Sequence, residues 1–271
     1  MTLLLQTLRS YNIKENSFEI PFINKNIKIF ADDEICSWVE IYKPEFYNKI
    51  IEMHKNDSSF NNKIPLKMYA LINYFFSFIS FDISHILKNN FLPKPNSVII
   101  ELGSGIGLFP IFLNKALGYP VTFDLVELEI THEEKDKQSF YNKFKSENRA
   151  KIGMDDQSEY INREPINTLH ILKKFTSLNK VECNIYSPDE ILKKQFSNKY
   201  DYMYSFRSYC FLYPYSTYSD FLKDSMKPNS LSLCDLETAD FNQEEEFKQT
   251  FNILKVVKEK SWWKRVISIK K

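Results

Sequence analysis

Three glycines between two apolar runs are the residues whose spacing most directly suggests ligand chemistry. The chain has only five glycines, and Gly103, Gly105 and Gly107 lie at alternate positions in "ELGSGIG", directly after "SVII". Glycine lets the backbone approach a ligand closely, and a helix that follows aims its first N–H groups at negative charge. The stretch therefore predicts a nucleotide-binding loop. A plain strand-to-helix turn is the alternative, although one glycine would suffice for it.

An acidic residue at the end of the next apolar run supports this interpretation. Glu127 lies twenty residues after Gly107, at the end of "VTFDLVEL", where a carboxylate can accept hydrogen bonds from both hydroxyls of a ribose. Asp124 is the rival, but it is expected inside a buried strand. The dinucleotide fingerprint G-x-G-x-x-G would place its third glycine at Leu108, so a dinucleotide with a pyrophosphate is the less favoured ligand.

The stretch "VIIELGSGIG" resembles the first motif of the class I S-adenosylmethionine-dependent methyltransferases, in which an acidic residue precedes the glycine loop. The resemblance covers roughly residues 97 to 271. It implies S-adenosyl-L-methionine as cofactor and S-adenosyl-L-homocysteine as product. The cofactor-binding residues that it implies are Glu101, Gly103, Ser104, Gly105, Gly107, Glu127, Asp189 and Ser205.

The same resemblance assigns parts of the cofactor to these residues. Glu101 and the backbone of the loop would border the methionine part, and Gly107 would allow close helix packing. Glu127 would accept hydrogen bonds from the ribose hydroxyls. Asp189, in "YSPDEI" after the third predicted strand, would accept the adenine amino group. For Asp189, a place in a helix N-cap within "SPDE" is the alternative.

Transfer of a methyl group from a sulfonium is an in-line displacement, so it depends mainly on orientation, and a hydroxyl acceptor also benefits from a general base. His132, just past the second predicted strand, and His170, in the helical "NTLHILKK", are candidate bases. Arg207 is a candidate to grip a phosphate or carboxylate, and Tyr209 to orient a hydroxyl. Their structural alternatives are solvated histidines, a structural ion pair and aromatic packing. Secondary base candidates are Asp235 and Glu237.

The tyrosine-rich stretch 204 to 218, "YSFRSYCFLYPYSTY", resembles a segment of sugar- and capsule-modifying methyltransferases. This likeness implies O-methylation of a small hydroxylated or phosphorylated acceptor, such as a sugar, a sugar nucleotide or a capsular polysaccharide precursor. Two alternatives are a NAD-dependent oxidoreductase of the same fold and a non-catalytic, methyltransferase-like partner subunit.

The elements that must position these residues follow from the order of apolar runs. From about residue 98, short apolar runs alternate with helical segments, which predicts a parallel sheet with crossover helices. The last run, "NILKVVKEKSWWKRVISIKK", leaves no room for a crossover helix and predicts a hairpin with one antiparallel strand. The expected fold class is α/β, a Rossmann-like, mostly parallel seven-stranded sheet with an antiparallel C-terminal hairpin.

Two further regions complete the expected organisation. Residues 1 to 96 lack the strand-helix rhythm and are predicted to form a helical N-terminal cap, ahead of a methyltransferase domain at 97 to 271. Residues 129 to 178 exceed an ordinary crossover and are predicted to form a helical insertion.

Composition limits the class of partner. A formal net charge of +1 gives no general reason to expect nucleic acid, and four widely separated cysteines suggest neither a metal site nor a disulfide framework. The apolar stretch from Met68 is expected to be too short to span a bilayer, and it contains Asn73 and Asp82, so a buried helix is expected. No signal peptide is predicted, so the expected location is cytoplasmic. Trp262 and Trp263 are expected in the core or in a homodimer contact.

Overall fold

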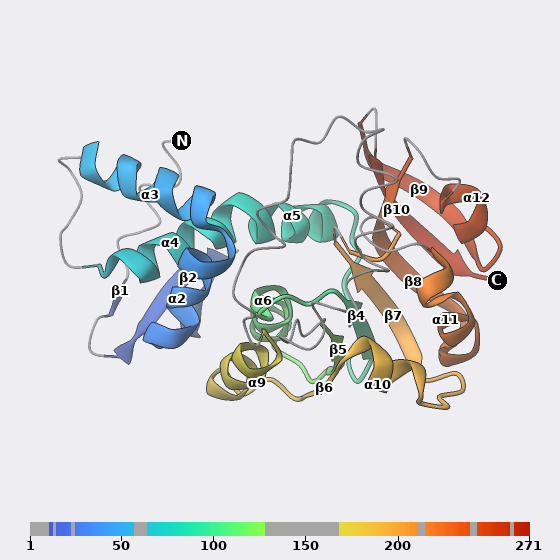
Figure 1. Cartoon of the computed structure of the whole chain (residues 1–271). Helices are drawn as coiled ribbons and strands as arrows, with labels where there is room; N and C mark the ends of the chain where they lie inside the picture. Colours follow the sequence, from blue (N-terminus) through green and yellow to red (C-terminus); the bar gives the residue numbers. More distant parts are fainter. Residues whose placement is uncertain are drawn as a thin grey trace. The chain divides into compact units, whose positions relative to one another are not determined.

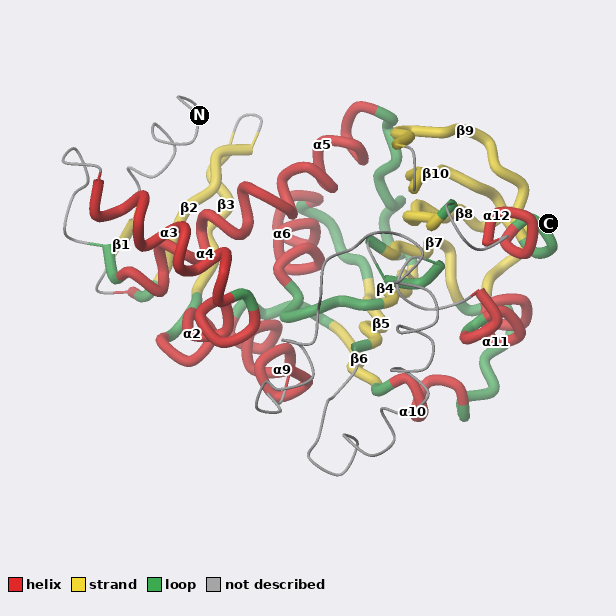
Figure 2. Tube along the Cα trace, turned by 45° about the horizontal axis from the view of Figure 1, so that its top comes forward, coloured by secondary structure: helices red, strands yellow, loops and turns green. Residues whose placement is uncertain are grey.

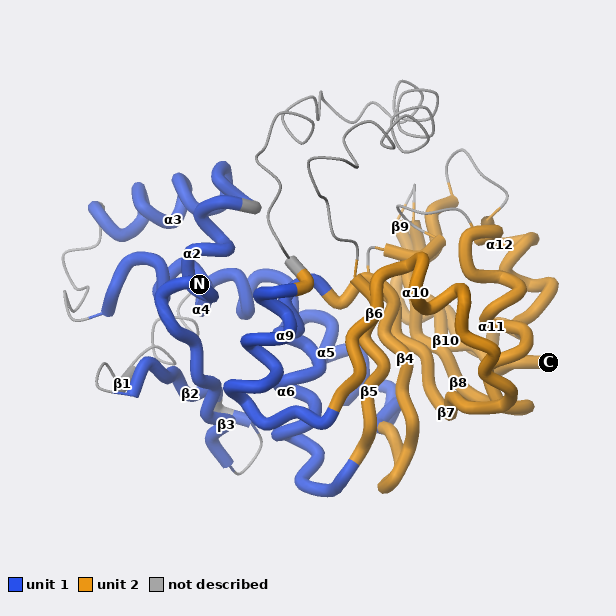
Figure 3. The backbone as a smooth tube through the Cα atoms, turned by 60° about the horizontal axis from the view of Figure 1, so that its bottom comes forward, with its two compact units in different colours: residues 1–92, 105–120, 170–182 blue, residues 93–104, 121–169, 183–271 orange. Residues whose placement is uncertain are grey.

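The computed structural model describes residues 11–12, 15–22, 25–56, 64–127, 168–206, 208–210, 215–238, 243–260 and 263–271 (Figure 1). These residues form two compact units (Figure 3). Unit 1 comprises residues 1–92, 105–120 and 170–182, and unit 2 comprises residues 93–104, 121–169 and 183–271. The division that we expected at residue 96 therefore differs from these units, since two segments beyond it belong with the N-terminal region.

Unit 2 is built on the sheet that the strand-helix rhythm predicts. Its strands are β4 (Val98–Leu102), β5 (Thr122–Val126), β6 (Cys183–Tyr186), β7 (Tyr200–Ser205), β8 (Met226–Glu237), β9 (Phe251–Lys260) and β10 (Trp263–Lys270). They lie in the order β6-β5-β4-β7-β8-β10-β9. The neighbours from β6 to β8 pair in parallel, and β10 is antiparallel to both β8 and β9. The expected fold class, including the antiparallel terminal hairpin, is confirmed.

Three short helices cover one face of this sheet. They are α10 (Pro188–Leu192), α11 (Ser219–Ser225) and α12 (Gln243–Phe247), and a 3₁₀ turn, η3 (Tyr215–Thr217), precedes α11 (Figure 1). Their apolar side chains join one buried cluster with residues of β4, β7, β8, β9 and β10. The core of unit 2 therefore lies between these helices and the sheet, as expected when one stripe of each helix is apolar.

The outer strand β9 forms one edge of the sheet among the described residues. Its pairing with β10 shifts register twice, between Arg265 and Val266 and between Ile267 and Ser268, so that Val257 and Leu254 have no opposite residue. Leu254 and Val256 are among the most exposed large apolar side chains of the described chain. Trp263, at the start of β10, is buried, whereas Trp262 lies outside the described residues.

Unit 1 is mostly helical, and it also contains a sheet that the sequence analysis did not predict. The strands β1 (Tyr11–Asn12), β2 (Ser17–Phe22) and β3 (Lys25–Phe30) form an antiparallel meander, visible in Figure 2 as the β2–β3 hairpin. The helices are α2 (Asp33–Tyr42), α3 (Pro44–Asn56), α4 (Leu66–Tyr74), the π-helical segment η2 (Phe75–Ile79), α5 (Ser80–Lys88), α6 (Leu108–Leu117) and α9 (Thr168–Leu178).

The run from Leu66 to Lys88 is a continuous helical segment, longer than the apolar stretch alone suggested. Its length and composition make this segment a candidate for a membrane span. Our expectation that the apolar stretch is too short to span a bilayer was therefore wrong. Polar side chains within it are buried in the fold, since Asn73 donates to the Tyr69 carbonyl at 2.8 Å and Asp82 is fully buried. Of the apolar window of this segment 44% is buried, so the buried helix that we expected is confirmed only in part.

Candidate functional site

Parallel α/β sheets bind ligands at the carboxyl ends of their strands, at the point where the strand order reverses. In unit 2 that point lies between β4 and β7, because the chain runs from β4 outward to β5 and β6 and then returns to β7 on the other side. Glu101 and Ser205 lie at these two strand ends, and Glu127 directly follows β5. The predicted site residues Glu101, Glu127 and Ser205 therefore lie at the carboxyl ends of neighbouring strands.

Hydrogen bonds fix the start of the glycine loop against the neighbouring strand. The backbone N–H groups of Gly103 and Ser104 both donate to the Val126 carbonyl, at 2.8 and 3.1 Å. The next residue, Glu127, donates its own N–H to the Tyr186 carbonyl at 3.1 Å. The start of the loop and the half-buried Glu127 are thereby held side by side. The N–H groups of Gly103 and Ser104 already donate to Val126, so they are not available to a ligand.

The three glycines have different neighbours. Gly103 has a φ of +80°, and a Cβ built on it would lie 2.1 Å from the Ser208 Oγ. Gly105 has a φ of +55°, with no described atom within 4 Å of its Cβ position. The loop thus packs tightly at its first glycine, whereas no described atom restricts the Cβ position of its second.

The third glycine precedes a helix. Gly107 is left-handed at the N-cap of α6, and a Cβ there would lie 2.6 Å from a Leu172 methyl group of α9. Within unit 1, Gly107 thus allows α6 and α9 to approach closely, the role that the resemblance implied for it.

Ser205 is a structural residue, which corrects its expected place among the cofactor-binding side chains. It is fully buried; its hydroxyl donates to the Leu102 carbonyl at 3.1 Å and accepts from the Tyr209 N–H at 2.9 Å. Both hydrogen-bonding directions of the hydroxyl are used in joining β7 to β4 and in closing the turn after β7.

Tyr209 is also a core residue, so its expected contact with an acceptor is wrong. Its side chain is fully buried, its ring stacks on Tyr215 with centroids 6.1 Å apart, and its hydroxyl donates to the Tyr215 carbonyl at 3.0 Å. Tyr215 in turn shares a hydrogen bond with Thr250. Of the two interpretations of these tyrosines, aromatic packing holds.

The thiols at this end of the sheet are poor nucleophiles. Cys210 and Cys234 are fully buried, and burial raises the pKa of both thiols well above the usual value. Because the thiolate is the reactive form, they contribute packing and no covalent chemistry at neutral pH.

Asp124, the rival for the ribose hydroxyls, is part of a buried polar network. It is fully buried in β5 and accepts from the Tyr200 hydroxyl at 2.6 Å, from the Asn184 amide at 2.8 Å and from the Lys199 ammonium group. A buried carboxylate needs such donors to offset its lost hydration. Asp124 therefore joins β5, β6 and β7, whereas Glu127 directly follows β5.

This network predicts a loss of stability at alkaline pH. Burial, then the hydrogen bond to Asp124 and its charge, raise the pKa of Tyr200 far above the unfolded value of 10.0. Stability is therefore complete below pH 10 and falls as pH rises, by about 1.4 kcal/mol per pH unit for each tyrosine that ionises only on unfolding. In Tyr200→Phe, the free energy of unfolding, measured in urea between pH 9 and 11, should depend less steeply on pH, and the difference should approach one proton at pH 11. An unchanged slope would mean that Tyr200 ionises in the folded protein.

Asp189 is exposed as the second residue of α10. The capping of this helix is done by its neighbours, because Ser187 accepts from the Glu190 N–H and Glu190 accepts from the Ser187 N–H. Asp189 is thus not the capping residue, and its contact with adenine stays a prediction.

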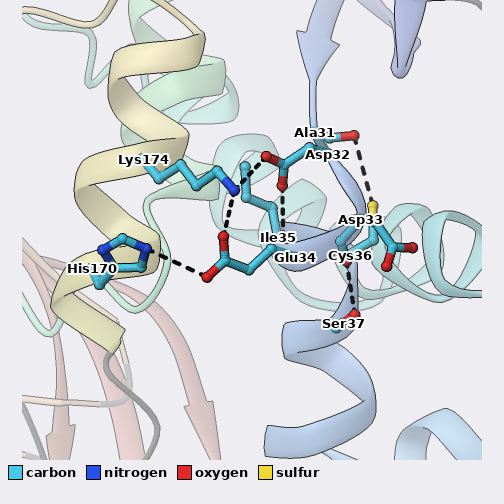
Figure 4. Close-up of polar contacts among 9 residues, drawn as sticks. All are labelled: Ala31, Asp32, Asp33, Glu34, Ile35, Cys36, Ser37, His170 and Lys174. Atoms are coloured by element: carbon cyan, nitrogen blue, oxygen red, sulfur yellow. Dashed lines mark hydrogen bonds and ion pairs between the residues drawn. The ribbon is translucent and has the colours of Figure 1, made fainter.

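Of the other candidate catalytic residues, His132 and Arg207 lie outside the described residues. His170 belongs to a surface cluster of unit 1, where its Nε2 lies 3.4 Å from a carboxylate oxygen of Glu34 (Figure 4). In the same cluster, Lys174 pairs with Asp32 at 2.6 Å and with Glu34. The ion-pair network joins α2 to α9, and a catalytic role for His170 stays a prediction.

A buried ion pair near the same sheet edge was missed by sequence reasoning. Arg265 and Asp235 are fully buried and face each other across β10 and β8, with Nε–Oδ1 and Nη2–Oδ2 distances of 2.6 and 2.8 Å. The guanidinium also lies 4.7 Å from the ring centroid of Phe206, directly after β7. Asp235 is therefore a structural partner of Arg265 and not the secondary base that we expected. Glu237 is buried at the end of β8.

Among the described residues, no group of three or more histidine, cysteine or acidic side chains has an arrangement that could hold a metal ion.

No protein-family model matches the chain. No curated protein matches it either. Solved structures with a similar fold include an S-adenosylmethionine-dependent methyltransferase from Aquifex aeolicus, at 14% identity and a TM-score of 0.45, covering 83% of this chain and 98% of that one. Another is TYW2 from M. jannaschii in complex with AdoMet, at 12% identity and a TM-score of 0.41, covering 96% and 88%. A Pyrococcus horikoshii protein is 11% identical with a TM-score of 0.45, covering 71% and 91%. At such identities and TM-scores the likeness assigns no function.

Proposed function

We propose that the chain is an S-adenosylmethionine-dependent methyltransferase. The observation that supports this most directly is the joined edge of β4 and β5, where the Val126 carbonyl accepts from Gly103 and Ser104 and so places Glu127 next to the start of the glycine loop. A carboxylate at this position can accept from two ribose hydroxyls, and the glycine backbone admits the rest of a nucleoside.

The remaining residues are assigned from the resemblance of the sequence to class I methyltransferases. Glu101, buried at 3% exposure at the end of β4, borders the methionine part of the cofactor, and Asp189 accepts from the adenine amino group. The bound cofactor supplies an electrophilic methyl group on a sulfonium. The chain holds the acceptor in line with that methyl group, and such positioning contributes about 7 to 11 kcal/mol.

For the acceptor we propose a small molecule that is methylated on oxygen, a hydroxylated or phosphorylated sugar or a precursor of a surface polysaccharide. The support for this choice comes from the sequence, in which Arg207, shortly after β7, would grip an anionic group and His132, after β5, would take the hydroxyl proton. Transfer of a labelled methyl group to sugars, sugar phosphates and sugar nucleotides tests this finer assignment. Labelling of none of these classes, by protein that binds the cofactor, would refute it.

Calorimetric titration with S-adenosylhomocysteine, with NAD in parallel, tests the cofactor. We expect micromolar binding of S-adenosylhomocysteine and none of NAD. Binding of NAD alone would identify an oxidoreductase, and binding of neither would refute the proposal for the isolated chain.

The same titration tests Glu127. In Glu127→Gln, the loss of the charge should weaken S-adenosylhomocysteine binding by about 1.5 to 3 kcal/mol, the value of hydrogen bonds to a charged group. The matched control is Glu182→Gln, which removes an exposed carboxylate just before β6. Equal affinities of the wild type and a folded Glu127 variant would exclude Glu127 from the site.

A further inference from the structure

Lysines from separate segments of unit 1, apart from the residues discussed so far, lie near Lys115, and two of the group lie over one aromatic ring. Phe30 is half-buried at the end of β3, and the ammonium nitrogens of Lys28 and Lys115 lie 5.1 and 5.4 Å from its ring centroid. Lys25 donates to the Lys115 carbonyl at 3.0 Å. Strand β3 and the last turn of α6 therefore bring the positive charges of three lysines close together.

A fourth lysine is held there by the turn after α9. The Asn179 side chain accepts from the Phe30 N–H at 3.0 Å and donates to the Phe30 carbonyl at 2.8 Å, which fixes this turn against β3. The next residue, Lys180, is left-handed with a φ of +57°, and its N–H donates to the Ser177 carbonyl. Helix ends of this kind favour glycine or asparagine, so a lysine here keeps its charge at a conformational cost.

The charges of this lysine cluster (Lys25, Lys28, Lys115 and Lys180) are only partly offset. Lys28 pairs with Glu15 and lies opposite Glu19 on β2, so its own charge is compensated. None of the ion pairs among the described residues involves the other three lysines. Burial, then repulsion from Lys180 and Lys28, lowers the pKa of Lys115.

The carboxyl ends of α6 and α9 offset part of the remaining charge. Each helix end contributes about half a negative charge, so about two of the three remaining positive charges stay uncompensated. Binding of an anion would therefore lower the electrostatic free energy of this cluster of positive charges.

We propose that the lysine cluster of unit 1 is a binding site for the diphosphate group of a small molecule. Lysine binds phosphate as a point charge, and a diphosphate that bridges two groups carries two negative charges, which equal the two uncompensated positive charges. Two of the four lysines, Lys28 and Lys115, lie over the same ring, and Lys25 contacts the Lys115 carbonyl, so their charges are close together. All of these residues belong to unit 1, so the proposal does not depend on the proposed methyl transfer.

Calorimetric titration of the full chain with inorganic pyrophosphate at low salt tests this site. We expect binding that weakens with added salt, and Lys115→Gln and Lys180→Gly should each weaken it by up to about fivefold, the effect of losing one exposed ion pair. Lys180→Gly also relieves the left-handed backbone, so this variant should melt no lower than the wild type while it binds less. The matched control is Lys248→Gln, a lysine paired with Glu244 and Glu245 on α12.

Orthophosphate and a single-stranded oligonucleotide serve as the other two ligands. Weaker binding of orthophosphate than of pyrophosphate supports a diphosphate site. The proposal is overturned if the wild type does not bind pyrophosphate, if Lys248→Gln loses as much affinity as the two cluster variants, or if the oligonucleotide binds more tightly through the same lysines.

Discussion

Replacing Arg265 with methionine is expected to lower the free energy of unfolding by about 3 to 5 kcal/mol, the usual cost of leaving one member of a buried ion pair without its partner. Asp235 is fully buried and accepts two parallel hydrogen bonds from the guanidinium. Methionine has a similar length but donates no hydrogen bond, so the carboxylate must either stay charged in an apolar environment or take up a proton. Urea unfolding followed by circular dichroism measures the difference.

The double variant Arg265→Met/Asp235→Leu is the matched control. Removing both charges avoids the stranded carboxylate, and such replacements are often neutral. We therefore expect the double variant to be more stable than Arg265→Met alone. If the single variant lost less than about 1 kcal/mol, the pair would behave like an exposed surface pair, in conflict with its burial.

The second large effect is expected at Gly103. Alanine there has to adopt a φ of +80°, and its methyl group would overlap the Ser208 hydroxyl. The left-handed backbone costs about 1 to 2 kcal/mol, and the overlap adds about 1 to 3 kcal/mol, so Gly103→Ala should lose about 2 to 5 kcal/mol in urea unfolding.

Gly105 provides the comparison within the same loop. Gly105→Ala has the backbone cost alone, about 1 to 2 kcal/mol, because no described atom lies near its Cβ position. The added methyl group fills space that we assign to the ligand, so this variant should stay folded and bind S-adenosylhomocysteine more weakly. Ser208→Gly should partly restore the stability of Gly103→Ala. Equal stabilities of the two alanine variants would contradict the tight packing at Gly103.

The parts of the fold that could be predicted are those with local signals. The run 98–102 is apolar apart from Glu101 and is followed by glycines, and the left-handed Gly118 ends α6. The hairpin of β9 and β10 followed from the absence of room for a crossover. In contrast, β2 and β3 alternate apolar and polar residues, a strand pattern that was missed beside long helical segments.

The candidate site was predictable only in part, for a physical reason. Glu127 and the glycine loop follow from chain order, because parallel strands end at the same edge of a sheet. The pairing of Arg265 with Asp235 depends on the register of β10 against β8, and the contact of Ser208 with Gly103 depends on tertiary packing. Neither has a signal in a single sequence, and the packing of Tyr209 and Ser205 likewise appears only in three dimensions.

The irregular outer strand β9 has a consequence for solubility. A regular edge strand offers a row of N–H and C=O groups to which another chain can add, which leads to aggregation. The extra residues Leu254 and Val257 interrupt that row, and Lys255 and Lys258 place charges along it. Proteins use such bulges and lysines to prevent strand addition. The exposed apolar side chains of β9 can therefore be tolerated, because the backbone beside them is a poor template for a growing fibril.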